Sequence, residues 1–96
     1  MVDATEALAI GLADRVVPAA EVYPSARDLV ARYVGGPAQA LRAAKEAIDR
    51  GLGVDLDTGL AIETAQFASL FATEDQRIGM ASFIENGPGK ASFVGR

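Results

Sequence analysis

The sequence predicts a mostly α-helical protein. Three observations point to this fold class: apolar residues recur at helical spacing through most of the chain, helix-capping residues precede several of these segments, and glycine or proline stands in the gaps. Residues typical of strands are few: the pair Val16 and Val17 is the one candidate strand, and a search for a second finds only "FV" in the tail and scattered valines inside helical patterns. We therefore expect about five helices and one short strand, in a single unit that covers residues 1–96.

A short helix is expected at the N-terminus. Asp3, with Glu6 three residues later, forms a capping-box pattern, and Gly11 supplies the ending that helices prefer. The next residues typical of a strand are Val16 and Val17. They have no complementary strand elsewhere in the sequence, so they are either irregular or pair with a sheet outside these residues.

Two longer helices are expected in the middle of the chain. Pro24 stands where a helix begins, and helically spaced apolar residues follow it until Gly35 and Gly36. Pro37 opens the next helix, and Gly51 is expected just past its end as the C-terminal cap. The core face of that helix is expected to carry Leu41, Ala44 and Ile48.

Two more helices complete the prediction. Asp57 is expected to cap a fourth helix that runs to Phe71, because its carboxylate can accept hydrogen bonds from the first turn. Thr73 with Gln76 forms a second capping box, and "NGPG" ends the helix that it opens. The tail "KASFVGR" is too short to form structure of its own. One stripe of the fourth helix carries Leu60, Glu63, Phe67 and Leu70.

The composition argues against several classes of function. The chain has no cysteine and no histidine, so it lacks a thiolate nucleophile and the commonest metal ligand, and we expect no metal site. A formal charge of −4 with dispersed basic residues argues against nucleic acid as a partner. No apolar run approaches the roughly 20 residues of a membrane span, and no secretory signal is recognisable, so a cytoplasmic location is expected.

The residues do not form a recognisable active site. Glu63, a carboxylate on an apolar stripe, could have the raised pKa of a general acid or base. No second acid, base or nucleophile is positioned with it, so we favour a structural role in which it caps a neighbouring helix or accepts buried hydrogen bonds. "GLGVDLDTG" lacks the preceding strand and the Gly-Lys-Ser/Thr ending of a phosphate loop. We expect no catalytic residue in this chain.

Four segments in sequence order carry a family resemblance: "EALAIGLADRVVP", "AKEAI", "ETAQFASLFATEDQRIGMASF" and "KASFVGR". From about Ala4 to Val94 the chain resembles the C-terminal portion of the crotonase superfamily, the enoyl-CoA hydratases and isomerases. The resemblance implies an N-terminal spiral of β-β-α turns that holds the sheets, and a C-terminal helical region that packs on it and drives trimer formation. Val16 and Val17 would then join that spiral.

The resemblance also implies a site that is shared with other parts of the fold. In the family the oxyanion hole and the catalytic carboxylates lie in the N-terminal portion, so this chain is expected to be inactive alone while contributing one edge of the acyl-CoA site. The resemblance implies two CoA-binding residues in this chain: Phe67, near the adenine of a neighbouring subunit's CoA, and Lys90, at a phosphate. The family's basic residue stands earlier, where this sequence has Asn86, and Ile78 replaces the usual glutamate.

Two other roles remain open from the sequence. The chain could be a stand-alone helical interaction module from a split or truncated crotonase gene, binding intact crotonases or itself without catalysis. That module would form a defined oligomer without affinity for CoA. A fragment without independent function would instead be molten or aggregated through exposed apolar faces.

Overall fold

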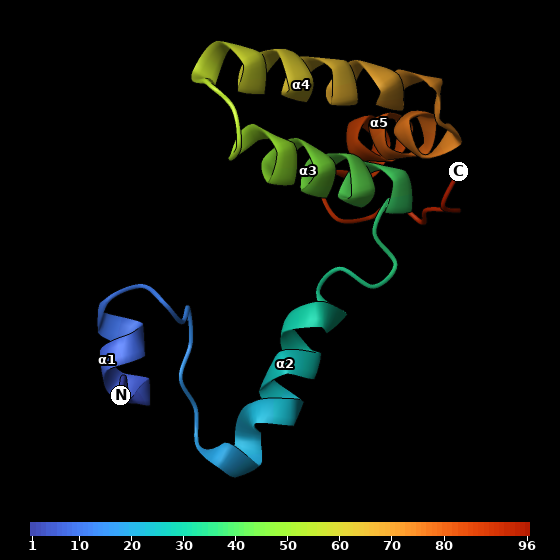
Figure 1. Ribbon diagram of the computed structural model, residues 1–96. Helices are drawn as coiled ribbons and strands as arrows, with labels where there is room; N and C mark the ends of the chain where they lie inside the picture. The colour runs from blue at the N-terminus through green and yellow to red at the C-terminus, as the bar shows by residue number, and fades with distance from the viewer. The chain divides into compact units, whose positions relative to one another are not determined.

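The computed structural model describes all 96 residues and consists of helices and connecting loops (Figure 1). The α-helices are α1 (Ala4–Ala9), α2 (Val22–Ala31), α3 (Ala38–Gly51), α4 (Leu56–Ser69) and α5 (Glu74–Asn86). Short 3-10 helices occupy Ala19–Glu21 and Leu70–Ala72. The prediction of a mostly α chain with five helices is confirmed, and no strand forms. The contacts divide the chain into two compact units, Met1–Val34 and Gly35–Arg96.

The first unit contains α1 and α2, joined by an extended segment. Asp3 caps α1 as predicted: its Oδ1 accepts the Glu6 N–H at 2.8 Å. Gly11 follows with φ +74°, a conformation that glycine adopts without strain, and it ends the helix as expected. The strand predicted at Val16 and Val17 is absent, because no second strand is present to pair with their N–H and C=O groups.

The helix α2 ends earlier than the sequence pattern indicated. It includes Pro24 in its first turn, where a missing N–H does no harm, but it stops at Ala31 rather than continuing to Gly35. The amides of Tyr33 and Val34 donate to carbonyl groups three residues earlier, at 3.0 and 3.3 Å. The residues after Ala31 therefore continue the apolar pattern of the sequence, but they form tighter turns with bonds between residues three apart instead of α-helix.

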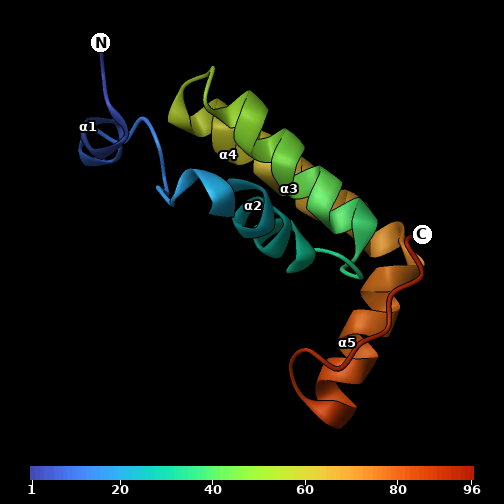
Figure 2. The ribbon, with the colours of Figure 1, turned by 90° about the horizontal axis from the view of Figure 1, so that it is seen from below.

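The second unit is built on a hairpin of α3 and α4, which lie side by side and run in opposite directions (Figures 1 and 2). Two predicted caps of this hairpin were wrong. Gly51 is the last residue of α3 rather than a cap beyond it, and Asp55 caps α4 in place of Asp57. Asp55 has the extended backbone that a cap requires, and its carboxylate accepts the Thr58 N–H at 3.0 Å and the Thr58 hydroxyl at 2.6 Å.

The helix α5 begins at the second predicted capping box. Thr73 Oγ1 accepts the Gln76 N–H at 3.2 Å and donates to the Leu70 carbonyl at 2.7 Å. Gly87, with φ +80°, ends the helix as "NGPG" predicted. The tail has no regular secondary structure, but it runs back along α5 to the first turn of that helix, where Asp75 holds it (Figure 2).

The chain buries very little apolar surface. Ala43 on α3 is the only buried apolar residue, at 7% exposure, and the predicted core positions Leu41, Ala44 and Ile48 are all exposed. Large side chains on the second unit, Phe67, Phe71, Phe83 and Ile84, are 59–78% exposed. Fully burying such a side chain contributes about 1.5–3 kcal/mol. The helices therefore present apolar faces that nothing in the same unit covers.

We expect Ala43→Leu to lower the free energy of unfolding by about 1–3 kcal/mol, because it adds methylene groups at the one closely packed apolar position. Urea denaturation followed by circular dichroism measures the change. Ala65→Leu, on an exposed position of α4, is the matched control and should leave stability nearly unchanged. Equal effects of the two substitutions would contradict this view of the packing.

Acid should weaken the start of α4 through Asp55. Hydrogen bonds from the side chain and then the backbone of Thr58 hold the pKa of the Asp55 carboxyl below its usual value of 3.8. Because the folded-state pKa is the lower one, this stabilisation is complete above about pH 3.8 and is lost as the pH falls through the folded-state value.

We therefore expect Asp55→Asn to reduce the loss of helical signal between about pH 5 and pH 2. Circular dichroism of wild type and variant over that range is the measurement. Asp57→Asn is the control, since Asp57 lies inside the first turn and is not the cap. An acid response of Asp55→Asn equal to that of the wild type would rule out this role of the cap.

Candidate functional site

The two site residues predicted from the sequence lie at different ends of α5. Phe67 lies near the end of α4 and shares a groove with the first half of α5. Lys90 lies in the loop after α5 and is exposed. A helix of 13 residues spans about 20 Å, and Lys90 lines neither of the grooves that Phe67 lines. The structure does not bring the two side chains together.

Phe67 belongs to an apolar groove formed by the start of α3, the end of α4, α5 and the tail. This groove, called here the aromatic groove, has a volume of about 260 Å³ and includes Phe67, Leu70, Phe71, Gly79, Met80 and Phe93, with Asp75 also in its lining. The rings of Phe67 and Phe71 meet edge to face, with centroids 5.4 Å apart and an interplanar angle of 75°. Phe67 remains 63% exposed, so part of its surface is free to contact another molecule.

A second groove lies between α3 and α4 and has a volume of about 320 Å³. Its α3 side is lined by Ala40, Ala43, Ala44 and Ala47. Glu63 lines the α4 side, is exposed, and takes part in none of the chain's ion pairs. The expectation that Glu63 accepts buried hydrogen bonds was therefore wrong, because the alanine side chains facing it have no donor.

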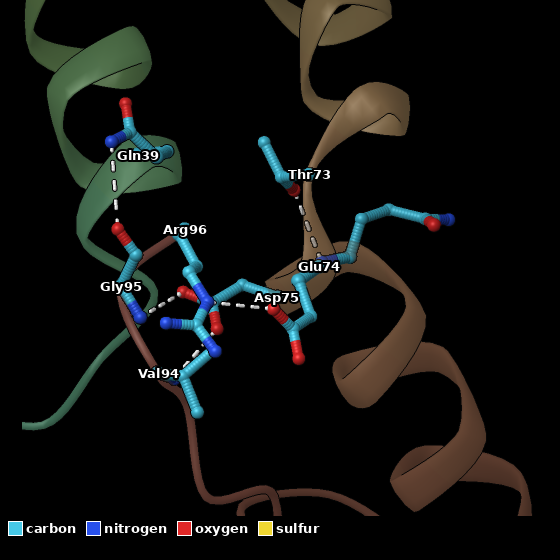
Figure 3. Close-up of polar contacts among 8 residues, drawn as sticks. Gln39, Thr73, Glu74, Asp75, Val94, Gly95 and Arg96 are labelled. Carbon is cyan, nitrogen blue, oxygen red and sulfur yellow. Dashed lines mark hydrogen bonds and ion pairs between the residues drawn. The ribbon is translucent and has the colours of Figure 1, made fainter.

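Asp75 is the most constrained polar residue of the chain, and the sequence patterns did not single it out. It is only 2% exposed, in the first turn of α5, where the helix dipole favours a negative charge. Its Oδ1 accepts the Val94 N–H at 2.7 Å and its Oδ2 accepts the Gly95 N–H at 2.9 Å (Figure 3). Its own N–H donates to the Arg96 carbonyl at 2.9 Å. These three bonds hold the tail against the start of α5.

Two further contacts hold the tail beside the bonds of Asp75: one is an exposed ion pair, and the other is a longer hydrogen bond. Arg96 Nε donates to Glu74 Oε2 at 2.8 Å, and this hydrogen bond, with the charge of Glu74, raises the pKa of the Arg96 guanidinium. Gln39 Nε2 donates to the Gly95 carbonyl at 3.5 Å, which connects the tail to the first turn of α3 (Figure 3). The tail is thus in contact with both α3 and α5.

The arrangement offers an aromatic surface and an ordered tail rather than a set of reactive groups. No group of three acidic, cysteine or histidine side chains that could hold a metal ion is present. A membrane span would need a longer and more uniformly apolar helix than any in this chain. Chemically, the aromatic groove can contact a flat or apolar ligand group through Phe67 and its neighbours.

The helical architecture is that of the C-terminal region of proteins with the crotonase fold. Residues 1–94 match the family model described as enoyl-CoA hydratase/isomerase. The chain belongs to this family, within the crotonase superfamily, and corresponds to the C-terminal portion of its members.

Individual relatives agree with this assignment. The short-chain-enoyl-CoA hydratase of Clostridium acetobutylicum is 40% identical over 84 residues, which are 88% of this chain and 32% of that protein. The crotonyl-CoA hydratase of Syntrophomonas wolfei is 34% identical over 96 residues, 100% of this chain and 36% of that protein. The crystal structure of an enoyl-CoA hydratase from Bacillus anthracis is similar with a TM-score of 0.85 and 32% identity, covering 97% of this chain and 35% of that one. The chain therefore spans about a third of the length of these relatives.

Proposed function

We propose that these 96 residues act as the C-terminal helical part of an enoyl-CoA hydratase/isomerase-like protein. In this role they contribute contacts between subunits and one edge of an acyl-CoA site, and they do not catalyse hydration by themselves. The substrates are enoyl-CoA esters of fatty acid metabolism, handled in the cytoplasm. One observation carries the proposal. The chain matches the family over residues 1–94, yet Ala43 is its only buried apolar residue, so it has almost no hydrophobic core of its own.

The exposed apolar faces support the packing part of this proposal. In the first unit, Val22, Leu29 and Val30 are 48–60% exposed, and in the second unit Phe83 and Ile84 are 59% and 78% exposed. Contiguous apolar surface of this kind is typical of protein interfaces rather than of surfaces in contact with water. In the proposed assembly, the β-β-α spiral covers some of these faces and neighbouring subunits cover others.

The aromatic groove supports the binding part of the proposal. An acyl-CoA ester carries an adenine ring and several phosphates, and an exposed aromatic ring such as that of Phe67 can stack on the base. Lys90 is an exposed, flexible cation that can meet a phosphate as a point charge. The two residues would contact different parts of one extended ligand, which is compatible with their positions at different ends of α5.

The chemical step is assigned to groups outside these residues. Hydration of an enoyl thioester needs N–H donors that stabilise the enolate-like oxygen and carboxylates that move the proton and activate water. The aromatic groove has a single carboxylate, Asp75, and both of its oxygens already accept hydrogen bonds from the tail. The groove can therefore hold part of the substrate while the reacting thioester lies elsewhere.

The purified 96-residue chain should show no hydration of crotonyl-CoA above the uncatalysed rate, because it has no pair of groups for the proton transfers. Loss of the ultraviolet absorbance of the enoyl thioester measures the reaction, with the crotonyl-CoA hydratase of Syntrophomonas wolfei as the positive control. Turnover by the chain alone would contradict the assignment of catalysis to other residues.

The same chain should bind a separately produced N-terminal spiral portion of a family member, and the complex should hydrate crotonyl-CoA. Size-exclusion chromatography detects the complex, and the absorbance assay detects activity. A defined oligomer of the chain that binds neither the spiral nor CoA would instead identify a non-catalytic interaction module.

In that complex, Phe67→Ala should weaken CoA binding about tenfold, since the loss of one base–aromatic stack costs about 1–3 kcal/mol. Lys90→Ala should weaken binding in a manner that disappears at high salt. Isothermal titration calorimetry with CoA measures both effects. Lys45→Ala is the matched control, because Lys45 is an exposed lysine on α3 that pairs with Asp49 at 2.8 Å. Unchanged CoA affinity in Phe67→Ala would remove Phe67 from the site.

A further inference from the structure

The buried carboxylate of Asp75 has no part in the proposed catalysis or substrate contact. It is the only buried charged side chain, and its hydrogen-bond partners lie 19 and 20 residues further along the chain. Burying an ionised carboxylate is costly unless its oxygens accept hydrogen bonds. Both oxygens of Asp75 do so, and the two bonds are short and charge-assisted. Such a group fixes the position of whatever it binds, which here is the tail.

The tail residue next to these bonds is part of the aromatic groove. Phe93 directly precedes Val94, is half-buried, and lines the groove together with Phe67. Its ring lies against α5 at Gly79: a Cβ at Gly79 would come within 3.3 Å of Phe93 Cε1 and 3.7 Å of Cζ. An alanine at this point of α5 would therefore crowd the ring, which would have to move by a few tenths of an ångström.

We propose that Asp75 is a positioning residue for the aromatic groove: by holding the backbone of Val94 and Gly95 it keeps the Phe93 ring against Gly79, as part of the wall that Phe67 also lines. The placement of the ring follows from contacts within this chain. Its consequence for acyl-CoA binding rests on the proposed function.

The other contacts of the tail are weaker candidates for this role. The ion pair of Arg96 with Glu74 is exposed on both sides, and exposed pairs contribute little to holding a segment in place. The Gln39 contact with the Gly95 carbonyl, at 3.5 Å, lies beyond the usual range of a strong hydrogen bond. The two bonds accepted by the Asp75 carboxylate, at 2.7 and 2.9 Å, are part-buried and come from adjacent backbone amides.

The test compares Asp75→Asn with wild type in the full 96-residue chain by nuclear magnetic resonance, without ligand. Asparagine keeps the shape of aspartate but replaces one acceptor oxygen with an NH₂ group, which faces an N–H donor. We expect hydrogen-exchange protection of the Val94 and Gly95 amides to fall about 10- to 100-fold. The contacts between the Phe93 ring and Gly79 should disappear from the spectra. Retention of those ring contacts in Asp75→Asn would overturn the proposal.

Glu74→Gln is the matched control. It changes the neighbouring acidic residue and removes the Arg96 ion pair, but it leaves the carboxylate of Asp75 intact. Both amide protection and the Phe93 contacts should stay as in wild type. A loss of amide protection and of Phe93 contacts equal to that in Asp75→Asn would overturn the proposal. It would show that the total negative charge at the start of α5, not the Asp75 carboxylate, holds the tail.

Gly79→Ala provides a second variant that acts on the ring without touching the carboxylate, and alanine is well suited to a helix interior. The added methyl group should push the Phe93 ring away by a few tenths of an ångström, which changes the chemical shifts of the ring, while Val94 and Gly95 keep their exchange protection within about twofold. Loss of this protection in Gly79→Ala would mean that the ring holds the tail rather than Asp75. This variant keeps the proposal testable if Asp75→Asn fails to fold.

Addition of CoA to the same samples separates this inference from the proposed function. Shifts of Phe67 and Phe93 signals in wild type, with at least threefold weaker binding in Asp75→Asn, would support both. No response to CoA in wild type, either alone or in complex with the spiral portion, would contradict an acyl-CoA edge formed by this chain. The ligand-free comparison would still decide the role of Asp75.

Discussion

Apolar side chains stabilise a fold only when another surface removes them from water, and this constraint governs the whole chain. In the hairpin of α3 and α4 this burial is partial: Ala43 is buried, and the alanines around it line a groove between the two helices. Elsewhere the large apolar residues of both units stay exposed. A small chain must bury most of its apolar surface to offset the conformational entropy lost on folding. These helices are therefore suited to pack their exposed apolar faces against another protein surface.

Hydrogen bonds with well-defined partners give the helices their limits despite this sparse core. Asp3, Asp55 and Thr73 each cap a helix by accepting an N–H from the residue three positions later. Asp75 works over a longer range, since it connects the first turn of α5 to the tail. The three caps thus fix where helices begin. The buried carboxylate of Asp75 fixes the position of the tail relative to α5.

The function proposed for this member of the enoyl-CoA hydratase/isomerase family gives these features a common purpose. A region that spans about a third of its relatives can carry binding surface and interfaces without carrying the reaction itself. The aromatic groove fits that division, since it is formed by aromatic rings, a small-residue helix surface and a fixed tail. In the proposed assembly the tail belongs to the binding surface, because Phe93 lines the aromatic groove next to the backbone that Asp75 binds.

The sequence by itself determined the helical class, the approximate helices and the caps Asp3 and Thr73, because these depend on residues within one helical turn. It also carried the family resemblance, while the roles of Phe67 and Lys90 stay predictions. It misplaced the cap of α4, since two aspartates stand two residues apart and only the backbone conformation distinguishes Asp55 from Asp57. Only the tertiary structure showed that Asp75 holds the tail, because these hydrogen bonds join residues that lie 19 and 20 positions apart in the chain.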